Sequence, residues 1–233
     1  MHERPLSTVP RSVTVLLMLG LCLQVAWHFS QPQPQARAED LRAPPSLNTL
    51  HLASLGEPVA LAKLLTLQLQ AFDNQPGISI PFRKLDFGYV ESWLERILQL
   101  DPNGQYPLLL ASRVYNSVSD KAKQRQMAEL VYREFLLDPE RRWSWLAYAA
   151  VGAKHQLHDL PLARKYAQAI REHATGKSVP SWAKQMEIFI LEDMNEVESA
   201  KILLGGLLDS GQVTDPNEIL FLSKELDSLA REK

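Results

Sequence analysis

The sequence has a single cysteine, Cys22, among its 233 residues. One thiol excludes a disulfide framework and a cysteine-based zinc site within one chain. Neither charge predominates, since 25 Lys and Arg stand against 27 Asp and Glu, for a formal net charge of -2. This balance excludes a strongly basic nucleic-acid-binding protein and a polyacidic tail. We therefore expect no nucleic acid among the partners of this chain.

The sequence also lacks a catalytic motif. The Gly205-Gly206 pair is not followed by the Lys and Ser or Thr of a phosphate-binding loop, so we expect it to permit close helix packing or a bend. Serine, histidine and aspartate occur, but no nucleophile elbow surrounds them. We expect a non-enzymatic protein that needs no cofactor and holds no metal.

His155 and His158 are the residues most similar to a metal site. Two histidines at i and i+3 can share a helix face, but a site needs a third and a fourth ligand. Their segment falls at a turn between two predicted helices, where solvated polar residues are expected. A metal-dependent enzyme is the less favoured alternative, and it would add the acidic residues Glu192, Asp193, Glu196 and Glu198.

The N-terminal fifth contains an apolar run that is typical of an export signal. Val13 to Phe29 spans 17 residues without Asp, Glu, Lys or Arg, after Arg4 and Arg11. As a helix it would rise about 25 Å, slightly less than the roughly 30 Å hydrocarbon core. Trp27 at its far end suits the membrane interface. We predict an N-terminal flank over 1–11 and a transmembrane signal anchor over 12–30.

Cleavage of this signal after Ala38 is the main alternative, because Ala36-Arg37-Ala38 has the small residues of a cleavage site. A buried core helix is a weaker alternative. Residues 31–46 follow as a linker in which proline favours extended backbone. The basic-then-apolar signal and the absence of thiol beyond Cys22 predict a single-pass protein of a bacterial inner membrane, with its C-terminal domain in the periplasm.

Residues 47–233 show helical periodicity to the end of the chain. Ser46 is expected to cap a short helix ending at Leu55, and Pro58 to open the next helix, whose apolar stripe contains Leu61, Leu64, Leu65 and Leu69. A loop over 74–84 interrupts the pattern and carries three large apolar residues. We expect them to pack on the chain's own first helices, or alternatively to contact a partner. These residues are Ile78, Ile80 and Phe82.

Three pairs of similar residues recur at an interval of 37 residues, which predicts stacked helical hairpins. The pairs are Asp101-Pro102 with Asp138-Pro139, Trp145 with Trp182, and Ala163 with Ala200. One hairpin cannot bury both sides of its apolar face, so the next hairpin completes the burial. Asp215-Pro216 is expected to open a terminal capping helix to about Arg231, which would cover the last hairpin with Leu220, Leu226 and Leu229.

The repeated segments resemble the tetratricopeptide repeat family in divergent form. Its first-helix pattern corresponds to Leu108, Ala111, Ser112 and Tyr115, then to Trp145, Tyr148, Ala149 and Gly152, and then to Trp182, Gln185, Met186 and Phe189. The period of 37 exceeds the family's usual 34, and another helical-hairpin solenoid is the alternative. The resemblance implies an all-α, right-handed solenoid whose groove, lined by first helices, receives a peptide or a partner helix.

Trp143 is the leading candidate for a binding residue. It precedes the repeat position Trp145 by two residues and follows Arg142, and an accessible Trp beside arginine suits a binding hot spot. Packing of Trp143 between adjacent repeats is the alternative. The neighbours expected in the groove are Tyr106, Arg113 and Asn116. We predict a membrane-anchored protein-binding scaffold, or alternatively a structural homo-oligomer in which the 74–84 loop inserts into the next copy.

Overall fold

The computed structural model describes residues 10–31, 38–75, 77–211 and 213–231, and these residues are mostly helical. The α-helices are α1 (Arg11–Ser30), α2 (Leu47–Ala53), α3 (Pro58–Gln70), α4 (Phe87–Leu100), α5 (Tyr106–Leu109), α6 (Lys121–Leu137), α7 (Pro139–Gly152), α8 (Leu160–His173), α9 (Ser181–Asp193), α10 (Val197–Asp209) and α11 (Pro216–Arg231). Two π-helical segments, η3 (Leu110–Val114) and η5 (Ala153–Leu157), and two 3-10 turns, η2 (Phe82–Lys84) and η4 (Tyr115–Ser117), complete the helical elements.

The chain divides into two compact units, which are described separately. The first comprises residues 1–38 with 76–78, and the second comprises 39–75 with 79–233. In the first unit α1 is a 20-residue helix with a mean hydropathy of 1.7 and no buried residue. An apolar helix was predicted here over 12–30, and the structure confirms it over Arg11–Ser30. Of the flank predicted over 1–11, residues 1–9 lie outside the described residues, and Arg11 is the first residue of α1.

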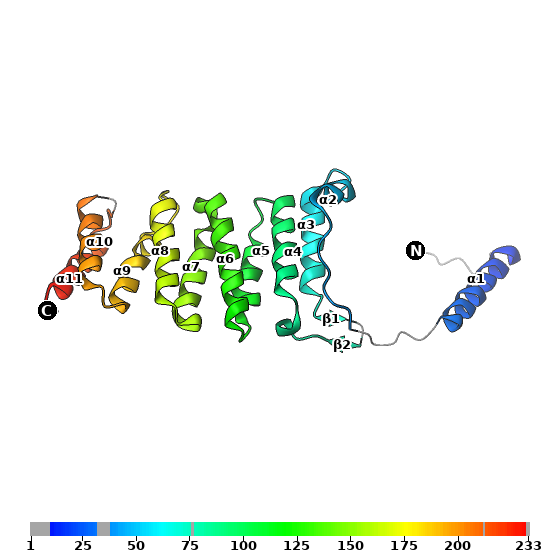
Figure 1. Ribbon diagram of the computed structural model, residues 1–233. Helices are drawn as coiled ribbons and strands as arrows, with labels where there is room; N and C mark the ends of the chain where they lie inside the picture. The colour runs from blue at the N-terminus through cyan, green and yellow to red at the C-terminus, as the bar shows by residue number, and fades with distance from the viewer. Residues whose placement is uncertain (1–9, 32–37, 76, 212, 232–233) are drawn as a thin grey trace. The chain divides into compact units, whose positions relative to one another are not determined.

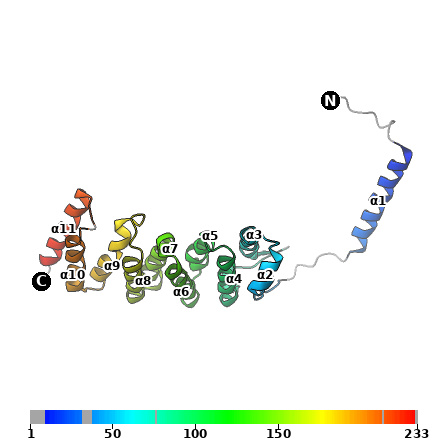
Figure 2. The same cartoon turned by 90° about the horizontal axis from the view of Figure 1, so that it is seen from above.

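In the second unit α2 to α11 follow one another side by side in chain order (Figure 1). Seen from above, α3, α5 and α7 lie along one side of this row, and α4, α6 and α8 lie along the other (Figure 2). Helices on one side also contact one another past the intervening helix, as α4 contacts α6 and α7 contacts α9. We call α3, α5, α7 and α9 the first helices and α4, α6, α8 and α10 the second helices.

The two kinds of helix begin differently. Asp86, Asp120 and Asp159 precede the second helices α4, α6 and α8, and each carboxylate accepts hydrogen bonds from backbone N–H groups of the first turn. Such N-caps satisfy donors that have no partner within the helix. The first helices α3, α5 and α7 carry proline in their first turn, where a missing N–H costs nothing, and α8 has both its Asp cap and a first-turn proline. Each helix from α3 to α8 therefore begins at an Asp cap or a first-turn proline.

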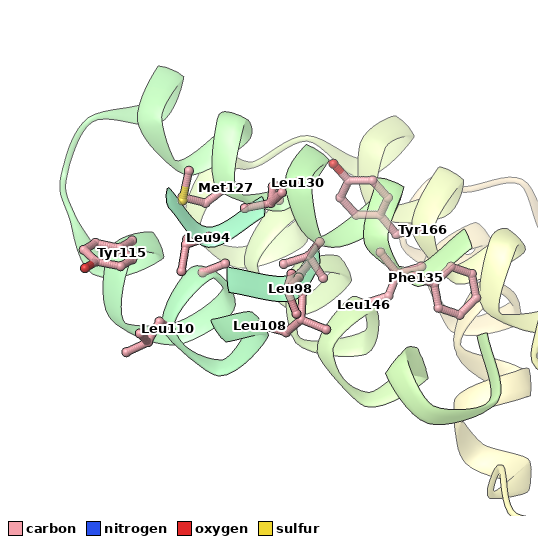
Figure 3. Packing of buried hydrophobic residues seen from close by; sticks show 14 of the residues in the cluster. Leu94, Leu98, Leu108, Leu110, Tyr115, Met127, Leu130, Phe135, Leu146 and Tyr166 are labelled. Atoms are coloured by element: carbon pink, nitrogen blue, oxygen red, sulfur yellow. The ribbon is translucent and has the colours of Figure 1, made fainter. Parts of the chain in front are cut away.

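The core is one long apolar cluster between the two layers of helices. Residues such as Leu94, Leu108, Met127 and Leu130 have almost no exposed surface and point toward one another (Figure 3). A second cluster lies at the C-terminal end, where Leu191 of α9 packs with residues of α10 and α11. The burial of apolar surface between consecutive helices is the main stabilising term of the fold.

Polar side chains join neighbouring hairpins at a regular interval in the sequence. Gln70 donates to the Tyr106 hydroxyl at 2.9 Å, Trp145 donates to Gln105 at 2.6 Å, and Lys165 donates to Glu129 at 3.0 Å. These partners lie 36, 40 and 36 residues apart. The interval is close to the 37-residue spacing of the sequence pairs.

The N-terminal boundary of the second unit differs from the predicted linker. Of residues 31–46, positions 32–37 lie outside the described residues, but three residues between 39 and 45 contact the helices or the strand β1. Leu41 is buried, the Arg42 carbonyl accepts from Trp93 Nε1 at 2.8 Å, and the Glu39 backbone pairs with the Gln75 amide. A side chain such as Leu41 contributes to stability when it leaves water, so this unit begins at Glu39 and not at residue 47.

Several local predictions are corrected. Leu64 and Leu220 were placed on buried stripes, but both are exposed, and Leu65 and Leu222 occupy the buried positions. The Gly205-Gly206 pair was expected to allow close packing or a bend, yet added Cβ atoms would meet nothing within 4 Å, so it serves no close packing. The 74–84 segment includes two short paired strands, β1 (Asn74–Gln75) and β2 (Ile78–Ser79), which a purely helical prediction omitted.

Candidate binding surface

The first helices carry large aromatic side chains that remain in contact with solvent. Tyr106 in α5 is half-exposed, Tyr148 in α7 is 46% exposed, and Trp182 in α9 is 54% exposed. Exposed aromatic residues in a row are unusual on a surface that binds nothing, because each ring leaves a large apolar area in water. We call Tyr106, Arg113, Trp143, Trp145, Tyr148 and Trp182 the aromatic surface.

Hydrogen bonds and ring contacts fix the orientation of these side chains. Gln70 of α3 holds the Tyr106 hydroxyl, and Gln105 holds the Trp145 indole N–H. The Trp145 ring stacks on Tyr148 with centroids 6.2 Å apart and an interplanar angle of 27°. A side chain held in one rotamer loses less conformational entropy when a partner binds.

Arg113 is the positively charged residue of the aromatic surface. The π-helical segment η3 carries this exposed residue, and its guanidinium carbon lies 5.0 Å from the centroid of the Tyr148 ring. A guanidinium over an aromatic face is held by the quadrupole of the ring and keeps its outer N–H donors free. No carboxylate is paired with Arg113 among the ion pairs of the described residues.

An apolar pocket of about 290 Å³ opens between α7 and α9 on this surface. The Trp143 and Trp182 rings meet edge to face at its wall, with centroids 5.5 Å apart. The pocket is lined by Trp143, Ser144, Ala147, Tyr148, Val151 and Trp182. It contains no charged side chain, so its chemistry suits an aliphatic or aromatic side chain.

A second apolar pocket, of about 330 Å³, lies between α3, the end of α4 and α5. Tyr106 and Pro107 contribute to one wall, and Lys63 and Leu67 contribute to the other. Tyr106 belongs both to this pocket and to the aromatic surface, so apolar pockets occur at both ends of that surface.

Arg142 is not part of the surface, which corrects its assignment as a partner-binding residue. It is only 3% exposed, and it donates to the Glu134 carboxylate at 2.7 Å and to the Pro102 carbonyl at 2.8 Å. Burial raises the pKa of Glu134, and the nearby Arg142 guanidinium opposes this rise. Arg142 therefore joins α6, α7 and the turn after α4 inside the protein.

Asn116 is also buried, and it is removed from the predicted surface for the same reason. Its Nδ2 donates to Gln156 at 3.3 Å. A Cβ at Gly152 would lie 2.9 Å from that nitrogen, so the absence of a side chain at Gly152 lets α7 approach η4. Asn116 thus sets the contact between two hairpins.

Trp143 occupies an intermediate position between the two predicted alternatives. It packs against the main cluster on one side and contacts Trp182 at the pocket wall on the other.

Ile80 and Phe82 of the 74–84 loop pack against the chain's own core, and the Phe82 ring meets the Tyr115 ring edge to face, with centroids 5.6 Å apart. These two residues are thus partly buried against the chain's own core, and Ile78 is also of intermediate exposure.

Sequence reasoning did not assign Tyr148 and Trp182 to the binding surface. Both were matched to first-helix positions of a repeat pattern, where burial is expected, but their rings are half-exposed. The sequence spacing does place Tyr148 and Val151 on one face of α7, because they lie three residues apart. The structure shows that this face is exposed.

The predicted metal alternative has no assembled site in the described part of the chain. No group of three or more His, Cys, Asp or Glu residues is close enough there to hold an ion. His155 and His158 are exposed, and His158 has φ of 55° at the end of η5. Asp193 forms an ion pair with Lys154 and Glu196 with Arg164, so these carboxylates bind cationic side chains.

No protein-family model, curated protein or solved structure matches the chain. Function is therefore inferred from the residues and contacts of the chain itself.

Proposed function

We propose that this protein is a membrane-anchored, non-enzymatic scaffold that binds another protein along the aromatic surface. The single observation that carries the proposal is the row of half-exposed rings Tyr106, Tyr148 and Trp182 on successive first helices, with a neutral apolar pocket between the last two. Tyr, Trp and Arg are the residue types that dominate binding energy at protein interfaces.

The helical hairpins form a solenoid related to the tetratricopeptide repeat in this proposal. Its support is the alternation of proline-started and Asp-capped helices from α3 to α7 and the inter-hairpin hydrogen bonds between residues about 36 apart. In such an arrangement each unit contacts its neighbours and presents one helix to a continuous surface. The bound segment is extended or helical and spans several hairpins.

The pocket and its surroundings indicate the chemistry of the partner. An apolar side chain fits the space between Trp143, Tyr148 and Trp182, and a carboxylate nearby would pair with Arg113. The partner segment therefore carries a large apolar residue close to an acidic residue. No metal and no cofactor are part of this function.

The helix α1 is the membrane anchor in the proposal. Its 20 residues and mean hydropathy of 1.7 support a single crossing, and the basic residues before it support a signal anchor of a bacterial inner membrane. The second unit would then act in the periplasm.

Site-specific photo-crosslinking in intact cells tests the binding surface. A photoreactive amino acid at Tyr148 is expected to give a discrete adduct, whereas the same group at exposed Glu172 on α8 is not. Arg113→Glu should weaken the adduct several-fold, and Lys177→Glu, also exposed, should leave it unchanged. Adduct formation at Glu172 alone would contradict the proposed surface, and an adduct between two copies would favour the homo-oligomer.

A further inference from the structure

The beginning of the second unit carries an apolar surface that no other described element covers. Leu55 is 91% exposed, Leu52 is 80% exposed and Leu64 is 63% exposed. On α3 and at its C-cap the exposed residues Ala60, Leu64, Leu67 and Ala71 follow the spacing of a single helix stripe, opposite the buried Leu65 and Leu69. We call Leu52, Leu55, Ala60, Leu64, Leu67 and Ala71 the leucine face.

Residues 47–71 have an amino-acid composition close to that of a membrane-embedded segment. Between Leu47 and Ala71 the charged residues are Glu57 and Lys63 alone. The helices α2 and α3, bent by 108°, together have the length and apolar composition of a membrane-crossing segment. They do not cross, because Leu65 and Leu69 of the same helix are buried in the main cluster. One side of α3 thus packs in the protein core, and the opposite, exposed side is also apolar.

Leu55 shows that the exposed leucines are not a by-product of folding. Its φ of 49° lies in the left-handed region, which leucine rarely adopts. A glycine or asparagine would fit this backbone with less strain, and a side chain that is 91% exposed adds no packing. A large apolar group at this turn therefore has a role outside the fold of the unit.

We propose that the leucine face lies on the lipid bilayer from which α1 emerges. This inference rests on the anchor in the proposed function. Only residues 31–38 separate Ser30 at the end of α1 from Glu39, where the second unit begins. Eight extended residues reach at most about 28 Å, and the 13 residues of α3 rise about 20 Å. Glu39 pairs with Gln75, just beyond the C-terminal end of α3. The tether therefore keeps this end of α3 within reach of the lipid surface, and the N-terminal end lies about 20 Å farther along the helix axis.

The bilayer fits this face better than a charged partner does. With one lysine and one glutamate in the segment, the face has no electrostatic preference, and its contact depends on apolar burial at the headgroup boundary. We therefore expect binding to neutral phosphatidylcholine, with little dependence on salt. Lipid contact of the face would fix the orientation of the aromatic surface relative to the membrane.

Fluorescence of the full chain in phosphatidylcholine vesicles tests the inference. In a Cys22→Ser background, a cysteine introduced by Leu64→Cys carries an environment-sensitive NBD label. Ile202→Cys on α10 is the matched control, since Ile202 is also an exposed aliphatic residue on a helix. Doxyl-labelled phosphatidylcholine is expected to quench the label at 64 at least twofold more than the label at 202.

Flotation of the same vesicles separates the two proposals. A chain that floats but shows equal quenching at both positions overturns the lipid contact and leaves the anchor intact. A blue-shifted label at 64 that lipid does not quench assigns the leucine face to another protein surface and also overturns it. A chain that does not float contradicts the anchor and the inference together.

Discussion

At the scale of single residues, buried polar groups differ in whether they have partners. Glu187 is buried between two arginines and accepts from Arg171 at 2.8 Å and from Arg164 at 3.5 Å, which joins α8 to α9. The Tyr115 hydroxyl is equally buried but has no hydrogen-bond partner among the described residues. A buried polar atom without a partner costs its desolvation free energy, so these positions should respond to mutation in opposite ways.

Removing the Tyr115 hydroxyl should stabilise the protein. Burial raises the pKa of Tyr115, as expected for a phenol that has lost its contact with water. We expect Tyr115→Phe to raise the free energy of unfolding by about 1 kcal/mol. Tyr166→Phe is the matched control, since its hydroxyl donates to Glu129 at 3.0 Å, and it should lose about 1 kcal/mol. Urea unfolding measures both, and a less stable Tyr115→Phe would reveal a partner for the hydroxyl.

Asp159 should make stability depend on pH in the acid range. The backbone N–H of Leu162, and then Arg125, lower the pKa of Asp159 below its ordinary value of 3.8. A carboxylate with a lowered folded pKa stabilises the protein fully above its unfolded pKa, and this contribution is lost as pH falls through the folded pKa. Asp159→Asn should therefore flatten the pH dependence of unfolding below about pH 4.

Arg125→Gln provides the comparison for Asp159, because it removes only the second cause of the lowered pKa. Arg125→Gln should flatten the pH dependence of the free energy of unfolding below about pH 4 less than Asp159→Asn does. An Asp159→Asn variant with an unchanged slope between about pH 4 and pH 2 would contradict the role of this carboxylate.

At the scale of secondary-structure elements, helix starts were more predictable than the faces that helices bury. Ser46, Pro58 and Pro216 mark helix starts in the sequence as they do in the structure, because capping and proline effects depend on neighbouring residues alone. Leu64 and Trp182 satisfied the same periodic pattern as their buried neighbours, yet both are exposed. Which apolar side of a helix is covered depends on the next hairpin, which local periodicity does not specify.

The candidate surface was likewise predicted only in part. Tyr106, Arg113 and Trp143 were placed together from the expected first-helix groove, and the structure places all three on first helices or in the π-helical segment η3 that follows α5. Arg142 was misplaced because arginine is usually exposed, whereas here the Glu134 carboxylate pairs with its charge and the Pro102 carbonyl accepts from one of its terminal nitrogens in the interior. Long-range partners of this kind have no local signal.

The Gly205-Gly206 pair in α10 offers a stabilising change at the scale of one helix. Glycine weakens a helix interior by about 0.5–1 kcal/mol relative to alanine, and a methyl group at either position meets nothing within 4 Å. Gly205→Ala and Gly206→Ala should each raise stability by about this amount. Gly152→Ala should lower it, because the new Cβ would lie 2.9 Å from Asn116 Nδ2. Thermal unfolding that ranks Gly152→Ala with the other two would contradict the packing described for α7.

At the scale of the whole second unit, the two apolar clusters imply two levels of stability. The main cluster draws buried residues from α2 to α9, whereas the C-terminal cluster depends on α9, α10 and α11. In α11 Leu222 and Leu229 are buried, but Ile219, Leu220 and Phe221 are exposed. In a row of helices that contact mainly their neighbours, stability is a sum of local terms, and the end with fewer buried contacts opens first.

Hydrogen exchange of the full chain tests whether the two clusters open separately, with one cavity-creating substitution in each cluster. Leu204 in α10 and Leu130 in α6 have no exposed surface, and a Leu→Ala change at such a site costs about 2–5 kcal/mol. Leu204→Ala should accelerate exchange in α10 and α11 while α4 and α6 keep their protection, because opening the C-terminal cluster leaves the main cluster packed. Leu130→Ala should accelerate exchange across α4 to α8. If Leu204→Ala accelerated exchange in every helix equally, the second unit would unfold as one cooperative body, and the C-terminal cluster would not be a separate unit of stability.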